Sequence, residues 1–180
     1  MKKLLMIIPV VILLCFTFSC QDKEVKAELE EFKAQAEVEE QNKELIRNYL
    51  EEMDKKNFEI YSEVFAPDAK IYLPSNSSEP MSVEQSVQMA KSVYAAFPDF
   101  SHSIEELIAV GDKVIGRAID RGTHQGEFNG IPATGKKIEM SVIVIFYFKE
   151  GKIVEAREEI DMLGLYQQLG MELKPKEEEK

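Results

Sequence analysis

The spacing of apolar residues changes once along this chain, at Pro98. Between residues 42 and 97 they recur with the 3.6-residue period of amphipathic helices, and between 103 and 160 with the period of 2 typical of strands. The second part predicts two hairpins, 103–123 and 137–160, each with a glycine in its turn. Helices followed by a meander of antiparallel strands favour an α+β fold.

Local signals divide the helical part. A first helix is expected to end around Lys56, and Asn57 to cap a shorter helix that reaches Phe65. Pro67 is expected to end that helix before a strand over 69–73. Ser82 and Gln85 form a capping box at the start of the next helix. A last short helix is predicted over 163–169.

The strand over 138–148 is apolar at nearly every position. Such a strand is expected to be covered on both faces. Helices would cover one face, and a second subunit would cover the other. We therefore expect a homodimer formed through the sheet.

The first twenty residues form a targeting segment. Two lysines precede an apolar run from Leu4 to Phe18, which is shorter than the ~20 residues of a membrane span. Ser19-Cys20 ends the run and polar sequence follows, as in bacterial lipoprotein signals, where the cysteine receives the lipid. An uncleaved anchor and a plain secretory signal are the alternatives. The interpretation predicts a signal peptide over 1–19 and an exported protein anchored to a membrane of the cell envelope through Cys20.

Three further segments follow. Residues 20–41 are rich in Glu, Lys, Ala and Gln and predict a helical spacer. This spacer carries a narrow apolar stripe at Val25, Leu29, Phe32 and Ala36, so it is either a solvated stalk or a short interaction helix. Residues 42–171 form the domain, and 172–180 form a charged tail.

Charge and cysteine content exclude several functions. The 33 acidic residues exceed the 22 basic ones, which argues against nucleic-acid binding and against a basic membrane-binding patch. Cys15 and Cys20 are the only cysteines, and His102 and His124 are the only histidines. We therefore expect no disulfide framework, no metal and no cofactor.

Several motifs resemble the SnoaL-like polyketide cyclases, also called ester cyclases, of the nuclear-transport-factor-2-like superfamily. The most specific is Gly122-Thr123-His124-Gln125-Gly126-Glu127-Phe128-Asn129-Gly130-Ile131-Pro132-Ala133-Thr134-Gly135. Weaker matches are Phe65-Ala66-Pro67-Asp68, Ala96-Phe97-Pro98-Asp99 and the segment Asp161-Met162-Leu163-Gly164-Leu165-Tyr166-Gln167-Gln168-Leu169-Gly170. The resemblance runs from about Asn42 to Gly170.

The resemblance implies a fold and an activity. The fold is a conical barrel, in which a curved, mainly antiparallel sheet wraps over about three helices around an apolar pocket, usually in a dimer. The activity is ring closure of a polyketide ester by intramolecular aldol condensation, without metal or cofactor. A buried carboxylate in such a pocket has a raised pKa and suits proton transfer near neutral pH.

The resemblance also implies site residues. The family's acid/base aspartate matches Asp161, and the family often has a histidine at the position of His124. Each has a structural alternative, since Asp161 precedes a helix and would cap it, and His124 would order its loop. We also expect Tyr49, Tyr72 and Arg157 to line the pocket.

The sequence departs from the family pattern at two places. Ile71-Tyr72 stand where a histidine is common, and Arg157 stands where tryptophan is usual. Strand alternation places Arg157 and Glu159 on one face, either in the pocket or in solvent. Asp120 is an acid within an otherwise apolar strand. The expected function is therefore an envelope-anchored protein that binds a small apolar carbonyl compound and transfers protons, or a non-catalytic binding or envelope interaction protein.

Overall fold

The computed structural model describes residues 4–172 and 174, with side chains from residue 23 onward. Lys2, Lys3, the Cys20 side chain and most of the predicted tail lie outside the described part. The chain divides into two compact units, 1–38 and 39–180. Helix α1 (Leu4–Asp54) runs through the predicted spacer, which is therefore helical. Within the described residues, no helix is both long and apolar enough to cross a membrane.

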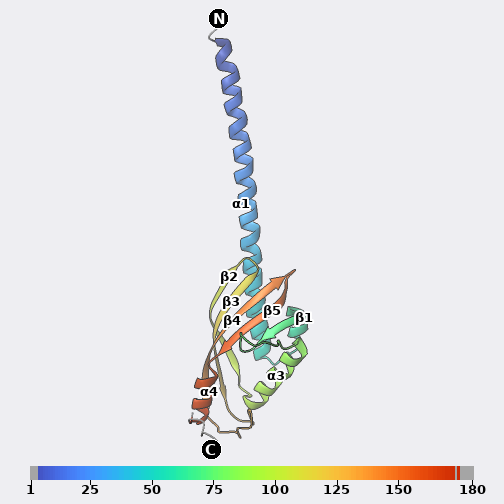
Figure 1. Ribbon diagram of the computed structural model, residues 1–180, viewed down its shortest axis with the longest axis vertical. Helices are drawn as coiled ribbons and strands as arrows, with labels where there is room; N and C mark the ends of the chain where they lie inside the picture. Colours follow the sequence, from blue (N-terminus) through green and yellow to red (C-terminus); the bar gives the residue numbers. More distant parts are fainter. Residues whose placement is uncertain (1–3, 173, 175–180) are drawn as a thin grey trace, which may run out of the picture. The chain divides into compact units, whose positions relative to one another are not determined.

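The second unit is built on an open, five-stranded sheet with the order β1-β5-β4-β3-β2 (Figure 1). Its strands are β1 (Phe65–Tyr72), β2 (Ser101–Val110), β3 (Lys113–Thr123), β4 (Lys137–Lys149) and β5 (Lys152–Ile160). Both predicted hairpins are present, as β2-β3 and β4-β5. Strand β1 pairs in parallel with β5, so the sheet is mixed, and it curves without closing.

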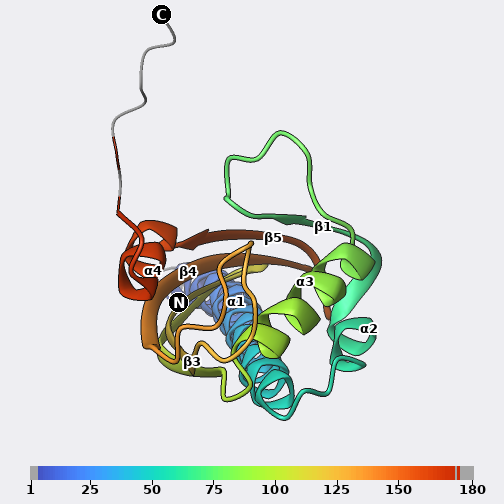
Figure 2. The same ribbon diagram turned by 90° about the horizontal axis from the view of Figure 1, so that it is seen from below.

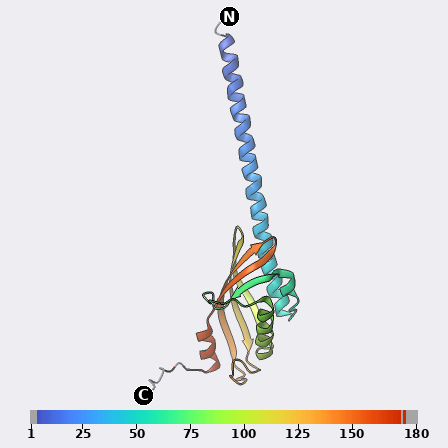
Figure 3. The same ribbon diagram turned by 45° about the vertical axis from the view of Figure 1, so that its right-hand side comes forward.

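Helices cover the concave side of this sheet. Figure 2 shows the strands curving around α3 (Val83–Ala96) and the last turns of α1, with α2 (Ile60–Val64) beside them. Figure 3 shows α4 (Met162–Leu169) at one end of the strands. The core between the layers contains Ile46, Phe97 and Ile153, each at most 1% exposed. This confirms the α+β class with helices packed on one face of a curved sheet.

The capping signals hold in part. The Ser82–Gln85 capping box is confirmed, with both reciprocal hydrogen bonds present. Asn57 Oδ1 accepts a hydrogen bond from the Glu59 backbone N–H, but α2 is shorter than predicted. Phe65, expected in that helix, begins strand β1, and Pro67 lies within the strand. A proline is tolerated there because β1 is an edge strand.

The loop after β3 is held by backbone contacts to the end of α3. The N–H groups of Gln125 and Gly126 both donate to the Ala96 carbonyl, each at 2.9 Å. A Cβ on Gly126 would lie 2.5 Å from the Ala95 carbonyl oxygen. Glycine is therefore required at 126 by close backbone approach.

Strand β4 is not covered on both faces within one chain. Its residues alternate between buried and exposed, and Ile143 is 49% exposed on the outer face. The continuous apolar run thus produces a core face and an exposed apolar face, rather than a strand enclosed by this chain alone.

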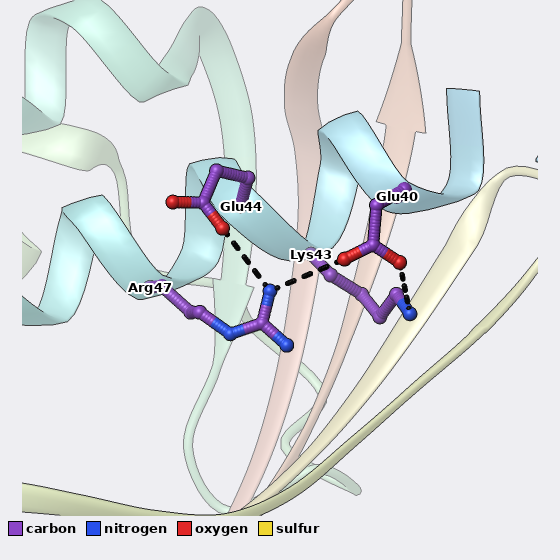
Figure 4. Close-up of polar contacts among 4 residues, drawn as sticks. All are labelled: Glu40, Lys43, Glu44 and Arg47. Carbon is purple, nitrogen blue, oxygen red and sulfur yellow. Dashed lines mark hydrogen bonds and ion pairs between the residues drawn. The ribbon is translucent and has the colours of Figure 1, made fainter. Parts of the chain in front are cut away.

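Residues 40–47 of α1, where the helix enters the second unit, carry a cluster of surface ion pairs. Lys43 Nζ lies 2.5 Å from Glu40 Oε2, and Arg47 Nη1 lies 3.2 Å from Glu44 Oε2 and 3.5 Å from Glu40 Oε1 (Figure 4). Both glutamates are exposed, so these pairs contribute little to stability. The opposite side of the same turns carries the buried Ile46 and Tyr49.

Candidate active site

A cavity of about 290 Å³ lies between the sheet and the helices. Aliphatic, aromatic and methionine side chains from α1, α3 and the inner positions of β3, β4 and β5 form most of its wall. The methionines of the wall are Met53, Met89, Met140 and Met162. Because methionine side chains are flexible and polarisable, this wall adapts to apolar ligands of irregular shape.

One histidine and two carboxylates interrupt this apolar wall: His102 of β2, Asp120 of β3 and Glu158 of β5. His102 and Asp120 are directly opposite each other in the β2-β3 pairing. All three side chains come from the sheet, so its backbone fixes their relative positions.

Asp54, the last residue of α1, holds His102 in place. Its Oδ1 lies 2.6 Å from His102 Nδ1 and accepts a hydrogen bond from the His102 backbone N–H at 3.1 Å. The Tyr94 hydroxyl donates to the same oxygen at 3.4 Å. The carboxylate therefore orients the imidazole, with Nδ1 bonded to Asp54 and Nε2 left as its second proton-carrying atom.

Asp120 lies in an unusual environment. It is only 5% exposed, and within the described part of the chain its Oδ1 has no hydrogen-bond partner. A buried polar atom without a partner is costly, which indicates either a protonated carboxyl or an oxygen kept for a ligand.

Burial raises the pKa of both carboxyls. For Asp120, loss of solvation and the Asp54 charge outweigh attraction by His102 and raise the pKa to about 6. For Glu158, loss of solvation and the Asp120 charge raise the pKa to about 7. The two groups therefore share protons near neutral pH.

The histidine shifts in the same direction for a different reason. Burial opposes its charging, but the hydrogen bond to Asp54 and the nearby charges of Asp120 and Glu158 outweigh burial and raise the pKa of His102. The cluster can thus supply a carboxylate base and a protonated imidazole within one cavity. Among the described residues, no group of three histidine, cysteine or acidic side chains is arranged to hold a metal ion.

Two residues suggested by the family resemblance lie elsewhere. Asp161 is exposed at the N-terminus of α4, where its Oδ1 accepts a hydrogen bond from the Gly164 N–H at 2.8 Å. His124 is fully buried, stacked on Phe97, with Nδ1 at 3.0 Å from Thr134 Oγ1. Neither lines the cavity. Their contacts match the capping and loop-ordering alternatives.

The three expected pocket residues also separate. Tyr49 lines the cavity, but Tyr72 and Arg157 do not. The Arg157 guanidinium stacks over the Tyr72 ring at 4.2 Å from its centre and bonds to Glu155 and to the Ser75 carbonyl. Glu159 also bonds to Ser75, through the backbone N–H and the hydroxyl. This face of β5 is therefore a polar layer directed away from the cavity.

Sequence reasoning missed Glu158 and His102 as site residues. A bulge near Val154 shifts the alternation of β5, so that Ala156, Glu158 and Ile160 face inward. A signal was present, because apolar residues at 156 and 160 mark that face as the buried one. Asp120 was visible as an acid in an apolar strand, and it does line the cavity.

Comparison with known proteins agrees with this architecture. The profile of the SnoaL-like polyketide cyclase family matches residues 43–169. The chain belongs to this family. A comparison with curated proteins gives no significant match.

Several solved structures are similar. AclR from Streptomyces galilaeus, a candidate hydroxylase, has a TM-score of 0.68 at 26% identity, covering 73% of this chain and 97% of its own. IdmH from Streptomyces antibioticus, a candidate polyketide cyclase, has a TM-score of 0.64 at 28% identity, covering 72% and 99%. A candidate polyketide cyclase from Acidithiobacillus ferrooxidans has a TM-score of 0.63 at 29% identity, covering 72% and 94%.

Proposed function

We propose that the protein catalyses proton transfer on a small, largely apolar carbonyl compound, as in closure of a polyketide ring. The observation that carries this proposal is the placement of Asp120 and Glu158, two carboxyls with pKa values near neutral, in the wall of an otherwise apolar cavity. Groups of this kind both accept and release protons at physiological pH.

The residues have separate roles in this proposal. Ionised Glu158 removes a proton from the carbon next to a carbonyl group. His102, oriented by Asp54, donates a hydrogen bond from Nε2 to the enolate oxygen that develops. Asp120 retains or returns a proton as the charge moves. The apolar wall excludes water and folds the substrate, which brings the two reacting carbons together.

An aldol closure balances with these groups alone. The carbon–hydrogen bond breaks, and its electron pair forms the new carbon–carbon bond to the second carbonyl. The resulting alkoxide takes up one proton, so the product is an isomer of the substrate. One proton is removed and one is returned, which the carboxyls and the histidine supply.

The polar cluster also limits the substrate. Asp120 Oδ1 lacks a partner in the described part of the chain, so a ligand that offers a hydroxyl or enol donor at this point would satisfy it. The rest of the wall favours a hydrocarbon or aromatic body. We therefore expect a compact molecule that is polar at one end and fits a cavity of about 290 Å³.

The proposal includes attachment and assembly. The apolar run that ends at Ser19-Cys20 supports lipidation of Cys20 and a position in the bacterial cell envelope. The outer face of the sheet supports a homodimer, since Ile108, Ile115 and Ile143 are exposed there, and Ile108 lies directly opposite Ile115. An Ile143→Lys variant is expected to shift sedimentation towards monomer. Monomeric sedimentation of the unmodified chain at micromolar concentration would contradict the dimer.

A direct test uses 5-nitrobenzisoxazole, whose ring opens when a base removes its carbon-bound proton and the nitrogen–oxygen bond breaks. The purified full chain is expected to accelerate this reaction, with a rate that rises with pH through about 7 as Glu158 ionises. Glu158→Gln is expected to lower the rate roughly 10²- to 10⁴-fold. Glu159→Gln, at the exposed neighbouring position, is the matched control and should retain the rate.

The same experiment separates the second candidate function, non-catalytic binding of a small apolar molecule. The adaptable methionine wall favours this candidate, because it suits retention of a ligand without chemistry. Binding of 5-nitrobenzisoxazole with no turnover above that of the Glu158→Gln variant would overturn the enzyme proposal and support the binder.

A further inference from the structure

Helix α1 exposes an apolar stripe before it enters the second unit. Val25, Leu29 and Phe32 are 58%, 51% and 70% exposed, and Ala36 continues the series. The spacings of four, three and four residues are those of the alternating d and a positions of a heptad repeat. They place the four side chains along one side of the helix.

Charged residues flank this stripe in the matching heptad positions. Glu28 occupies a g position, on one side of the stripe, and Lys33 occupies the following e position, on the other. Acidic residues bound the stripe, with Asp22 at the preceding a position and Glu39 at the next d position. Glu39 accepts a hydrogen bond from the Gly111 N–H at 2.7 Å, so the repeat stops where the second unit begins.

We propose that residues 25–36 form a short parallel coiled coil with the same segment of a second copy of this chain. Exposed large apolar side chains in this spacing are buried effectively by an identical helix. Charge decides the orientation. In a parallel pair, Glu28 of one chain meets Lys33 of the other, because g and e positions five residues apart face each other across the seam. Symmetry forms this pair twice.

The antiparallel arrangement is disfavoured by the same residues. Antiparallel helices bring g positions against g positions and e against e, which would place Glu28 near a glutamate and Lys33 near a lysine. Within its own helix, Lys33 Nζ contacts Glu30 Oε1 at 3.2 Å, but both side chains are more than half exposed. Such a pair is weak, so Lys33 is available to the partner helix.

A membrane surface is a poorer occupant of the stripe. Residues 22–41 contain eight acidic and three basic side chains. Helices that lie on membranes carry lysine and arginine along their polar face, and anionic headgroups would repel this one.

The coiled coil is short, and its strength depends on local concentration. Two heptads associate weakly in dilute solution, since nucleating and pairing so few turns costs more entropy than the stripe offsets. Here the inference rests in part on the proposed attachment at Cys20, because copies anchored to one membrane meet at a high effective concentration and in parallel.

Cysteine cross-linking in the full chain tests this contact. Ala36→Cys places a thiol in the seam, and Ala34→Cys is the matched control, with the same substitution on the opposite side of the helix. Mild oxidation of membranes and of concentrated purified protein is expected to cross-link the residue 36 variant and to leave the residue 34 variant near the level of the unmodified chain. Equal cross-linking at both positions, or none at 36, would overturn the proposal, since a contact through the sheet alone does not distinguish them.

Charge exchange tests the orientation. In the Ala36→Cys chain, Lys33→Glu is expected to reduce cross-linking about fivefold, because two attractive pairs become repulsive. Adding Glu28→Lys should restore it. Failure of that restoration would exclude the parallel register, and membrane release of Cys20→Ser reports on the anchor separately. Cross-linking at 36 in purified protein would support the coiled coil even if the anchor proposal fails.

Discussion

The carboxylate of Asp54 lies 2.6 Å from Nδ1 of His102 and joins the end of α1 to the second strand of the sheet. The same carboxylate also accepts from the His102 backbone N–H. One side chain therefore fixes both the backbone and the imidazole of a cavity residue. The site thus depends on helix α1 as well as on the sheet.

Replacing Asp54 by Asn is expected to lower the pKa of His102, because the hydrogen bond to a charged partner is what outweighs burial. A raised pKa in the folded state adds stability below the unfolded pKa, and this is lost as pH rises through the folded value. Asp54→Asn should therefore cost about 1–2 kcal/mol at pH 5 and less at pH 8. Urea unfolding and NMR titration of His102 measure both effects. A pH-independent cost would contradict this assignment.

Glu158 provides a second pH test. Its pKa of about 7 lies above the value of 4.5 for a free glutamate, so the folded state resists ionisation of this carboxyl. The penalty is absent below pH 4.5 and grows as pH rises through 7. Glu158→Gln should therefore be neutral at pH 4 and more stable than the unmodified protein by about 2 kcal/mol at pH 8.5. Urea unfolding at the two pH values, with Glu159→Gln as control, checks this. Equal stability at pH 8.5 would place Glu158 in contact with water.

Periodicity predicted most of the fold because it reports burial directly. The two hairpins and the Ser82 capping box follow from alternation and from local hydrogen-bonding chemistry. The parallel pairing of β1 with β5 could not be predicted in this way, because it depends on contacts between residues about 85 positions apart. Phe65 was assigned to a helix for the same reason, since pairing with Ile153 overrides its local preference.

The site was harder to predict than the fold. Whether Glu158 or Glu159 faces inward depends on a bulge of a single residue, which periodicity alone does not locate. Likewise, nothing local to Asp54 or His102 indicates that the end of a helix meets a strand 48 residues later. Only Asp120 stood out, because a carboxylate at an inward strand position breaks an apolar pattern.

The proposed anchor makes a prediction at Cys20. Replacement by Ser is expected to release the protein from membranes, because lipid attachment requires the cysteine sulfur and the acidic chain has no basic patch to retain it. Membrane fractionation and intact-protein mass spectrometry test this, with Cys15→Ser as the matched control. Unchanged fractionation, with no lipid mass on Cys20, would exclude a lipoprotein.

Asp161 and Glu158 are separated by the last prediction. Asp161 caps α4 through the Gly164 N–H, whereas Glu158 lines the cavity. Asp161→Ala is expected to cost about 1 kcal/mol of stability, and Asp161→Asn should be near neutral, because asparagine also caps helices well. Both variants should retain the rate of 5-nitrobenzisoxazole ring opening that Glu158→Gln loses. Thermal melting and that rate are the two measurements. If Asp161→Asn keeps its stability but loses roughly 10²-fold or more in rate, the proton-transfer role belongs to Asp161, and the assignment to Glu158 is wrong.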